Sequence, residues 1–227
     1  MKVTTDGCLF GAFVSRQISK QSPAVRTNRN ILDIGTGTGL LALMAVQKNN
    51  MAVDAIEIDK EAFEQASENT ALSPWHEQIN IIHADVRTFK PGYRYQYIIS
   101  NPPFYEQSLQ GDDAKKNIAH HDRGLLLAEL LVIIKKNLER EGHFYLLLPY
   151  SRNEEIKRLL AEQQLQILQL VLVRPSLHHD YFRIMIEGKQ AVTDPEETRV
   201  EEISIKDDNN EYSAAFADLL AAYYLHL

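Results

Sequence analysis

Apolar runs rich in β-branched residues alternate with helical patterns along most of this chain. Such alternation is typical of βαβ units, which join parallel strands through right-handed crossovers. It predicts an α/β fold in which helices cover both faces of a mostly parallel sheet. The expected strands span residues 30–35, 51–59, 79–85, 95–100, 142–149, 165–173 and 180–188. The expected helices span residues 39–48, 60–72, 122–138 and 151–163, the last with Ser151 as its N-cap.

The last two expected strands are joined by the short segment RPSLHH (174–179), which leaves no room for a helix. A connection this short reverses the chain, so it predicts one antiparallel strand at an edge of a seven-stranded sheet. Beyond residue 190 come an acidic stretch, 194–211, and an amphipathic tail, SAAFADLLAAYYLHL (213–227). We therefore divide the chain into a main domain, residues 1–190, and an extension, residues 191–227, whose terminal helix packs on that domain.

A glycine-rich turn, LDIGTGTG, follows the first expected strand and leads into the first expected helix of the alternation. Gly35, Gly37 and Gly39 let the backbone approach a ligand closely at the carboxyl edge of the sheet. The turn contains no lysine, whereas a phosphate ligand would favour one. Asp33 adds a negative charge beside the glycines. The turn therefore favours a cationic or ammonium-bearing ligand over a pyrophosphate.

Two further acids end the next two strands. Glu57 lies 22 residues after Gly35 and can accept two hydrogen bonds from a ribose diol. Asp85 ends the third strand, where its carboxylate can accept from an exocyclic amino group. Each acid alone could be an ordinary solvated loop residue. Because the carboxyl ends of parallel strands meet at one edge, three acids in this relation predict a shared site.

The fourth strand runs into SNPPFY at 100–105. Two prolines end a strand, but that does not explain the asparagine before them or the aromatic residue after them. The side-chain carbonyl of Asn101 and the backbone carbonyl of Pro102 can accept hydrogen bonds from both N–H groups of a planar amine. Pro103 stiffens the turn and Phe104 can stack on a planar substrate. The turn therefore predicts that the group acted on is a planar amine or amide, without separating adenine, guanine and glutamine.

ILDIGTGTGLLAL, Glu57, Asp85 and SNPPF resemble the ordered motifs of class I S-adenosylmethionine-dependent methyltransferases, over roughly residues 1–190. The resemblance implies a Rossmann-like methyltransferase domain and S-adenosyl-L-methionine as the cofactor. It places Asp33 near the cofactor's amino group, Glu57 at the ribose and Asp85 at the adenine. The residues implied in cofactor binding are Thr5, Asp6, Asp33, Gly35, Thr36, Gly37, Gly39, Glu57, Ile58, Asp85, Val86 and Asn101. The residues implied in catalysis are Asn101, Pro102, Pro103 and Phe104.

Within that family, MKVTTDGCLFGAF, SNPPFYEQSLQ and HHDRGLLLAELL are similar to bacterial methyltransferases that act on N6 of adenine-37 in a valine tRNA. The resemblance implies methyl transfer to an adenine of a tRNA anticodon loop. The alternatives that keep the chemistry are a protein-glutamine N5-methyltransferase and an rRNA guanine-N2-methyltransferase. A non-catalytic cofactor- and RNA-binding module is a third alternative, and a nicotinamide dehydrogenase shares the sheet but leaves SNPPFY unexplained.

The net charge of −7 comes almost entirely from residues 194–211, which hold eight acidic and two basic residues. The remaining, near-neutral body leaves room for a basic face toward tRNA; we expect neither DNA nor a membrane as a partner. The candidate tRNA contacts are Lys115, Lys116, His120, His121, Arg123, Arg152 and Arg174, with Arg158 and Arg183 as further candidates.

A single cysteine, Cys8, fits a reducing compartment and a packing role. The chain has no apolar run of membrane-spanning length and no signal-peptide pattern, so we expect a soluble cytoplasmic protein. Paired histidines lack ligand spacing, so we expect no metal site.

Overall fold

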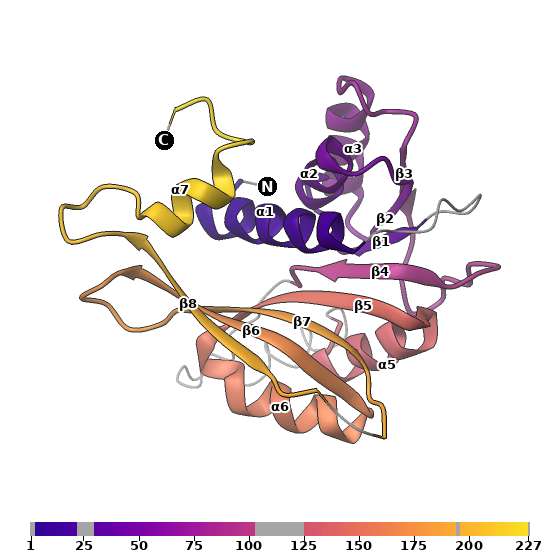
Figure 1. Cartoon of the computed structure of the whole chain (residues 1–227). Coiled ribbons are helices and arrows are strands. Elements are labelled where there is room, and N and C mark those ends of the chain that lie inside the picture. Colours follow the sequence, from indigo (N-terminus) through magenta and orange to yellow (C-terminus); the bar gives the residue numbers. More distant parts are fainter. Residues whose placement is uncertain (1–2, 22–29, 103–124, 194–195, 227) are drawn as a thin grey trace, which may run out of the picture.

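The computed structural model describes residues 3–21, 30–102, 125–193 and 196–226, and its strands form one eight-stranded sheet. The strand order is β3-β2-β1-β4-β5-β7-β6-β8 (Figure 1). The strands are β1 (Ile31–Ile34), β2 (Val53–Glu57), β3 (Ile79–His83), β4 (Tyr95–Ser100), β5 (Leu138–Pro149), β6 (Leu165–Ser176), β7 (Arg183–Gln190) and β8 (Arg199–Lys206). The expected α/β class and mostly parallel sheet are confirmed.

The antiparallel strand is β7, and its place differs from the expected edge. It pairs antiparallel with both β5 and β6, so it lies inside the sheet. Ile184, Met185 and Ile186 are all buried. Apolar side chains that alternate between two covered faces are typical of an inner strand, and an edge strand would carry polar residues at some of these positions.

An eighth strand, β8, completes the sheet where the sequence predicted only an acidic segment. It pairs in parallel with β6, from Gln169 beside Arg199 to Ser176 beside Lys206. Ile203 is its one residue that is buried in the core. A strand with so little apolar surface shows no alternating pattern in sequence, because the backbone ladder to β6 carries most of its pairing.

Helices cover both faces of the sheet (Figure 1). One face carries α1 (Thr5–Lys20), α2 (Leu40–Lys48), α3 (Lys60–Ala71) and the short α7 (Ala214–Leu220), and the opposite face carries α5 (Leu127–Asn137) and α6 (Asn153–Glu162). The expected N-cap Ser151 is wrong, because it lies in a 3₁₀ turn, η1 (Tyr150–Arg152), that precedes α6. Arg152 occupies the cap position, and no side chain there bonds the free N–H groups.

Helix α1 has no counterpart among the expected helices. Most of its residues are buried, Cys8 among them, so its sequence lacks the polar face that marks an amphipathic helix. The packing role expected for Cys8 is confirmed. Helix α7 lies against α1, where Phe216 and Leu220 are fully buried and Arg16 pairs with Asp218 at 2.8 Å. Within the described part of the chain, no helix is both long and apolar enough to cross a bilayer.

Candidate active site

The glycine turn after β1 adopts a backbone that only glycine takes readily. Gly35, Gly37 and Gly39 have φ values of +71°, +59° and +81°, all in the left-handed region. A Cβ atom at Gly35 would meet nothing within 4 Å, so the backbone borders open space there. The turn therefore needs its glycines for their conformation, and it leaves room for a ligand against the peptide of Gly35.

Neighbouring elements hold this turn in place. The N–H groups of Gly35 and Thr36 donate to the carbonyl of Ile56 in β2, at 2.9 and 3.0 Å. From α3, Asn69 donates to the carbonyl of Thr38 at 2.9 Å. These bonds fix the turn before any ligand arrives, which lowers the ordering cost of binding.

Asp33 is fully buried in β1, below the turn. Its Oδ2 accepts a hydrogen bond from the hydroxyl of Thr36 at 2.6 Å, and its Oδ1 has no partner among the described residues. Burial raises the pKa of the Asp33 carboxyl to about 7, and the negative charge of Glu57 adds to that rise. A cation bound near the turn would favour the ionised form of Asp33.

Glu57 ends β2 with its carboxylate facing the turn. Its Oε2 accepts from the N–H of Gly37 at 2.9 Å, and its Oε1 accepts from the N–H groups of Ile58 and Asp59 at 2.9 Å each. A carboxylate offers about four acceptor positions. Glu57 therefore ties the turn to the start of α3 and keeps capacity for one further donor.

Asp85 follows β3 at the same edge, and its carboxylate already has a partner. Arg87 makes a two-pronged contact with it, with Nε 3.0 Å from Oδ1 and Nη2 2.7 Å from Oδ2. Hydrogen bonds from Arg87 lower the pKa of Asp85. Arg87 was missed in the sequence, although its position two residues after Asp85 was a usable signal. Nearby, Ile58 is 53% exposed, whereas Val86 is buried in the core.

Asn101 and Pro102 follow β4 directly. Ser100 is buried, pairs with Ile34 of β1, and donates its hydroxyl to the Ile34 carbonyl at 2.9 Å. Gly35 and Asn101 therefore directly follow the paired ends of two neighbouring parallel strands, and such strands lie about 4.8 Å apart. Both Asn101 and Pro102 are half-buried. Pro103 and Phe104 lie outside the described residues.

The start of α1 reaches the same edge. Asp6 accepts from Nε of Arg183, at the start of β7, at 2.8 Å, and from the N–H of Gly7 at 3.1 Å. Burial works to raise the pKa of Asp6, but bonds from Thr4, Arg183 and Gly7 outweigh it and lower the pKa. Thr5 is exposed beside Asp6. The structure thus brings the first turn of α1 to the edge where β4 and β7 carry Asn101 and Arg183.

The candidate tRNA contacts divide into two groups. Arg152 and Arg174 are described, and each is paired with an acid: Arg152 with Glu155 at 2.7 Å, and Arg174 with Glu202 at 3.5 Å. Arg158 pairs with Glu162 at 2.7 Å. Lys115, Lys116, His120, His121 and Arg123 lie outside the described residues.

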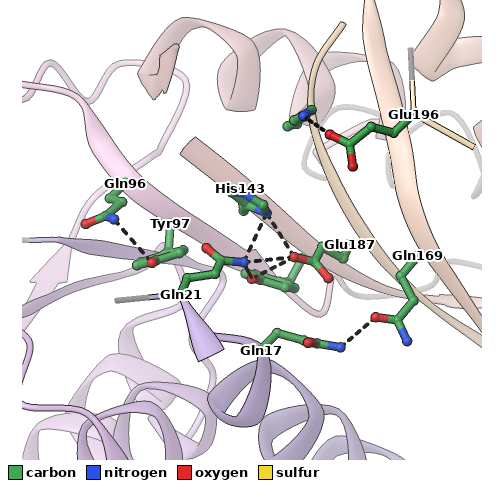
Figure 2. Close-up of polar contacts among 10 residues, drawn as sticks. Gln17, Gln21, Gln96, Tyr97, His143, Gln169, Glu187 and Glu196 are labelled. Carbon is green, nitrogen blue, oxygen red and sulfur yellow. Dashed lines mark hydrogen bonds and ion pairs between the residues drawn. The ribbon is translucent and has the colours of Figure 1, made fainter. Parts of the chain in front are cut away.

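A cavity of about 400 Å³ lies at the opposite, amino edge of the sheet. Figure 2 shows Gln21 and His143 converging on the buried carboxylate of Glu187. The Oε1 atom of Glu187 is 3.0 Å from Gln21 Nε2, 2.9 Å from His143 Nδ1 and 3.3 Å from the hydroxyl of Tyr145. These contacts tie the end of α1 to β5 and β7, away from the glycine turn and Asn101. No group of three or more metal-ligating side chains occurs within the ranges the structure describes.

Solved structures share this fold at low sequence identity. A predicted O-methyltransferase from Agrobacterium tumefaciens superposes with a TM-score of 0.69 at 16% identity, covering 96% of this chain and 97% of that one. A putative class I S-adenosylmethionine-dependent methyltransferase from Listeria monocytogenes has a TM-score of 0.64 at 14% identity, covering 90% of this chain and 68% of that one. They establish a class I methyltransferase fold.

Sequence relatives are much closer. Residues 14–153 match the methyltransferase small domain family. A protein from Dyadobacter fermentans, named tRNA1(Val) (adenine(37)-N6)-methyltransferase, is 36% identical over 99% of this chain and 91% of its own length. A protein of the same name from Yersinia enterocolitica is 33% identical over all of this chain and 87% of its own length. The chain therefore belongs to the methyltransferase small domain family and, within it, to the tRNA1(Val) (adenine(37)-N6)-methyltransferase family.

Proposed function

We propose that this protein transfers a methyl group from S-adenosyl-L-methionine to N6 of an adenine in tRNA, adenine-37 of a valine tRNA. The observation that carries the proposal is full-length similarity to relatives of that name, joined to an Asn-Pro turn beside the glycine turn at one sheet edge. A tRNA substrate places the reaction in the bacterial cytoplasm.

The residues around the glycine turn fit the cofactor. Gly35 borders open space, Glu57 keeps an acceptor position for a ribose hydroxyl, and Asp33 supplies a buried carboxyl near a cationic group. The exposed side chain of Ile58 offers an apolar surface to a flat ring. Thr5, Asp6, Thr36, Gly37, Gly39, Asp85 and Val86 complete the proposed cofactor site. When bound there, S-adenosyl-L-methionine supplies an electrophilic methyl group on its sulfonium.

Asn101 and Pro102 act on the substrate amine. The N6 nitrogen of adenine is a weak nucleophile because its lone pair is delocalised into the ring. Two carbonyl oxygens, one from the Asn101 side chain and one from the Pro102 backbone, accept hydrogen bonds from its two N–H groups. They also stabilise the positive charge that develops on the nitrogen during attack. The proton leaves after transfer, so no strong base is needed beforehand. Pro103 stiffens the turn, and Phe104 stacks on the base.

The tRNA contacts are proposed in two tiers. Lys115, Lys116, His120, His121 and Arg123 follow the Asn101 turn in sequence and offer phosphate contacts. Arg152 and Arg174 already pair with acidic side chains, so each guanidinium would have to contact a tRNA phosphate in addition to its carboxylate partner. A steep fall of tRNA affinity with rising salt is expected from this assignment.

The test uses radiolabelled S-adenosyl-L-methionine and total tRNA from a strain that lacks the enzyme, followed by nucleoside analysis. Labelled N6-methyladenosine in valine tRNA is the expected product. Label in protein, or in guanosine, would show that the substrate assignment is wrong. The Asn101→Ala variant is the matched control, because tRNA should be labelled far more slowly by it while its cofactor affinity is kept.

A further inference from the structure

A row of three side chains lies at the carboxyl edge of the sheet: Tyr150, Tyr181 and the candidate tRNA contact Arg174. The rings of Tyr150 and Tyr181 have centroids 5.4 Å apart and are tilted by 48°. The guanidinium of Arg174 lies over the ring of Tyr181, 5.7 Å from its centroid. Tyr150 is 36% exposed and forms the outer end of this row.

Contacts with β8 and β7 restrain the three side chains of the row. Glu202 of β8 pairs with Arg174 at 3.5 Å, and a hydrogen bond to Glu202 raises the pKa of the Tyr181 phenol. The N–H of Tyr150 donates to the carbonyl of Phe182 at 3.0 Å, which joins the end of β5 to the start of β7. An aromatic side chain with little freedom left loses little entropy when a ring stacks on it.

The row lies close to the methyl-transfer turn. Ser100 of β4 pairs with Leu146 of β5, so Asn101 lies beside Leu147. Tyr150 comes three residues later, about 10 Å further along the strand direction at ~3.3 Å per residue. Both positions face the same edge on neighbouring strands. A nucleic acid strand that places a base at Asn101 therefore brings a neighbouring nucleotide within reach of Tyr150.

The local charges favour stacking over a phosphate contact. Arg174 is paired with Glu202, Arg152 with Glu155 and Arg183 with Asp6. These acids compensate the cations, so the surface around Tyr150 gains little from phosphate neutralisation. Single-stranded RNA loops are recognised mainly through bases stacked on aromatic side chains or on arginine planes. The exposed ring is the feature of this surface that suits RNA.

We propose that Tyr150, supported by Tyr181 and Arg174, is a stacking platform for a base that flanks the methylated adenine. The inference rests on the proposed tRNA methyltransferase function and adds a substrate-binding subsite to it. It separates two tasks along one edge: Asn101 positions the reacting amine, and Tyr150 positions the loop that carries it.

The test compares the Tyr150→Ala and Tyr150→Phe variants on an anticodon stem-loop RNA. Stacking of one base on an aromatic ring is worth about 1–3 kcal/mol, so Tyr150→Ala should raise KM for the RNA about 5- to 150-fold. The values of kcat and of cofactor affinity should be nearly unchanged. Tyr150→Phe should behave like wild type. Leu72→Ala, which truncates an exposed apolar residue at the end of α3, is the control and should leave KM unchanged.

Two further measurements separate stacking from other roles. The KM ratio of Tyr150→Ala to wild type should be the same at about 50 and about 200 mM salt, because a lost phosphate contact would shrink with salt and a lost stack would not. An RNA with an abasic residue next to the target adenine should raise KM for the wild type and have no added effect on Tyr150→Ala. The wild-type half of this experiment does not depend on the folding of any variant.

Two results would overturn the platform: an unchanged KM for Tyr150→Ala, or additive effects of the abasic RNA and the variant at both flanking positions. An equal loss of cofactor affinity in Tyr150→Ala would point to a structural role and count against it as well. These outcomes differ from a failure of the proposed function, in which the wild-type protein methylates no tRNA at all.

Discussion

Buried carboxylates at the two edges of the sheet are hydrogen-bonded by different kinds of donor. At the carboxyl edge, Glu57 is bonded by three backbone N–H groups, and Asp33 by one hydroxyl. At the amino edge, Glu187 is contacted by the side chains of Gln21, His143 and Tyr145 (Figure 2). Backbone donors shape a turn that can face a ligand, whereas side-chain donors join elements to one another. We therefore expect ligand binding at the carboxyl edge and a stabilising role for the Glu187 contacts at the amino edge.

Asn101→Ala is expected to have the largest effect. Removing one preorganised polar contact to a transition state typically costs about 10²- to 10³-fold in kcat. The affinity for S-adenosyl-L-methionine should change little, because the glycine turn and Glu57 remain. Single-turnover kinetics together with calorimetric titration would show this split. Glu187→Gln serves as the amino-edge control, and a comparable loss of kcat there would break the comparison.

Glu187→Ala should destabilise the fold without altering the chemistry. The substitution removes the acceptor shared by Gln21, His143 and Tyr145 in a buried site. Each buried polar group that is left without its partner costs about 1–3 kcal/mol in the free energy of unfolding. Urea unfolding would measure the loss, and kcat per folded molecule should match wild type. A variant of normal stability would show that the network is not cohesive.

Asp33→Asn should change the pH dependence of the cofactor-free protein. The folded pKa of Asp33 is raised to about 7 from 3.8, so between those values the unfolded state loses a proton that the folded state keeps. Stability therefore falls as pH rises from about 4 to about 7, and it levels off above that.

The neutral amide that Asp33→Asn introduces carries no such penalty. The free energy of unfolding of the variant should match that of the wild type near pH 4 and exceed it by about 2–3 kcal/mol at pH 8. This gain is somewhat smaller than a pKa shift of ~3 units implies, because the charge-assisted hydrogen bond from Thr36 is weakened. Urea unfolding at several pH values would measure it. Parallel pH curves for the two proteins would contradict the prediction. The cofactor affinity of the variant should fall, since a buried carboxylate no longer meets the ammonium group.

Lys189→Ala should have the smallest effect. Lys189 pairs with Glu196 at 2.5 Å beside the amino-edge cavity, but Glu196 is largely exposed. Ion pairs with an exposed partner contribute little to stability and are screened by salt. Thermal unfolding at low and high salt would measure it, and a loss as large as that of Glu187→Ala would mean that the cohesive network extends to the surface.

Several parts of the site could be predicted from sequence because they depend on local chemistry. Gly35, Gly37 and Gly39 were expected in a tight turn, and all three adopt φ values that disfavour other residues. Glu57, Asp85 and Asn101 were expected at strand ends. Glu57 is the last residue of β2, and Asp85 and Asn101 come one or two residues after β3 and β4 end. Strand ends are readable because apolar β-branched runs stop abruptly at polar residues.

Other parts could not be predicted, for physical reasons. Helix α1 is buried on most sides, so it has no polar stripe to mark it. Strand β8 has one core residue and depends on β6 for its ladder. The order β5-β7-β6 depends on which edges pair in space, and a short connection between β6 and β7 indicates only that they run antiparallel.

The α/β class, the glycine turn, the acids at the strand ends and the Asn-Pro turn all follow from the sequence alone, because each depends on local backbone preference and side-chain chemistry. Other features exist only in the folded chain: β7 lies inside the sheet, Arg87 contacts Asp85, Arg152 and Arg174 are paired with acids, and the rings of Tyr150 and Tyr181 lie together. These are contacts between segments far apart in the chain or choices among possible partners. Packing and pairing energies settle them, and no local pattern records those energies.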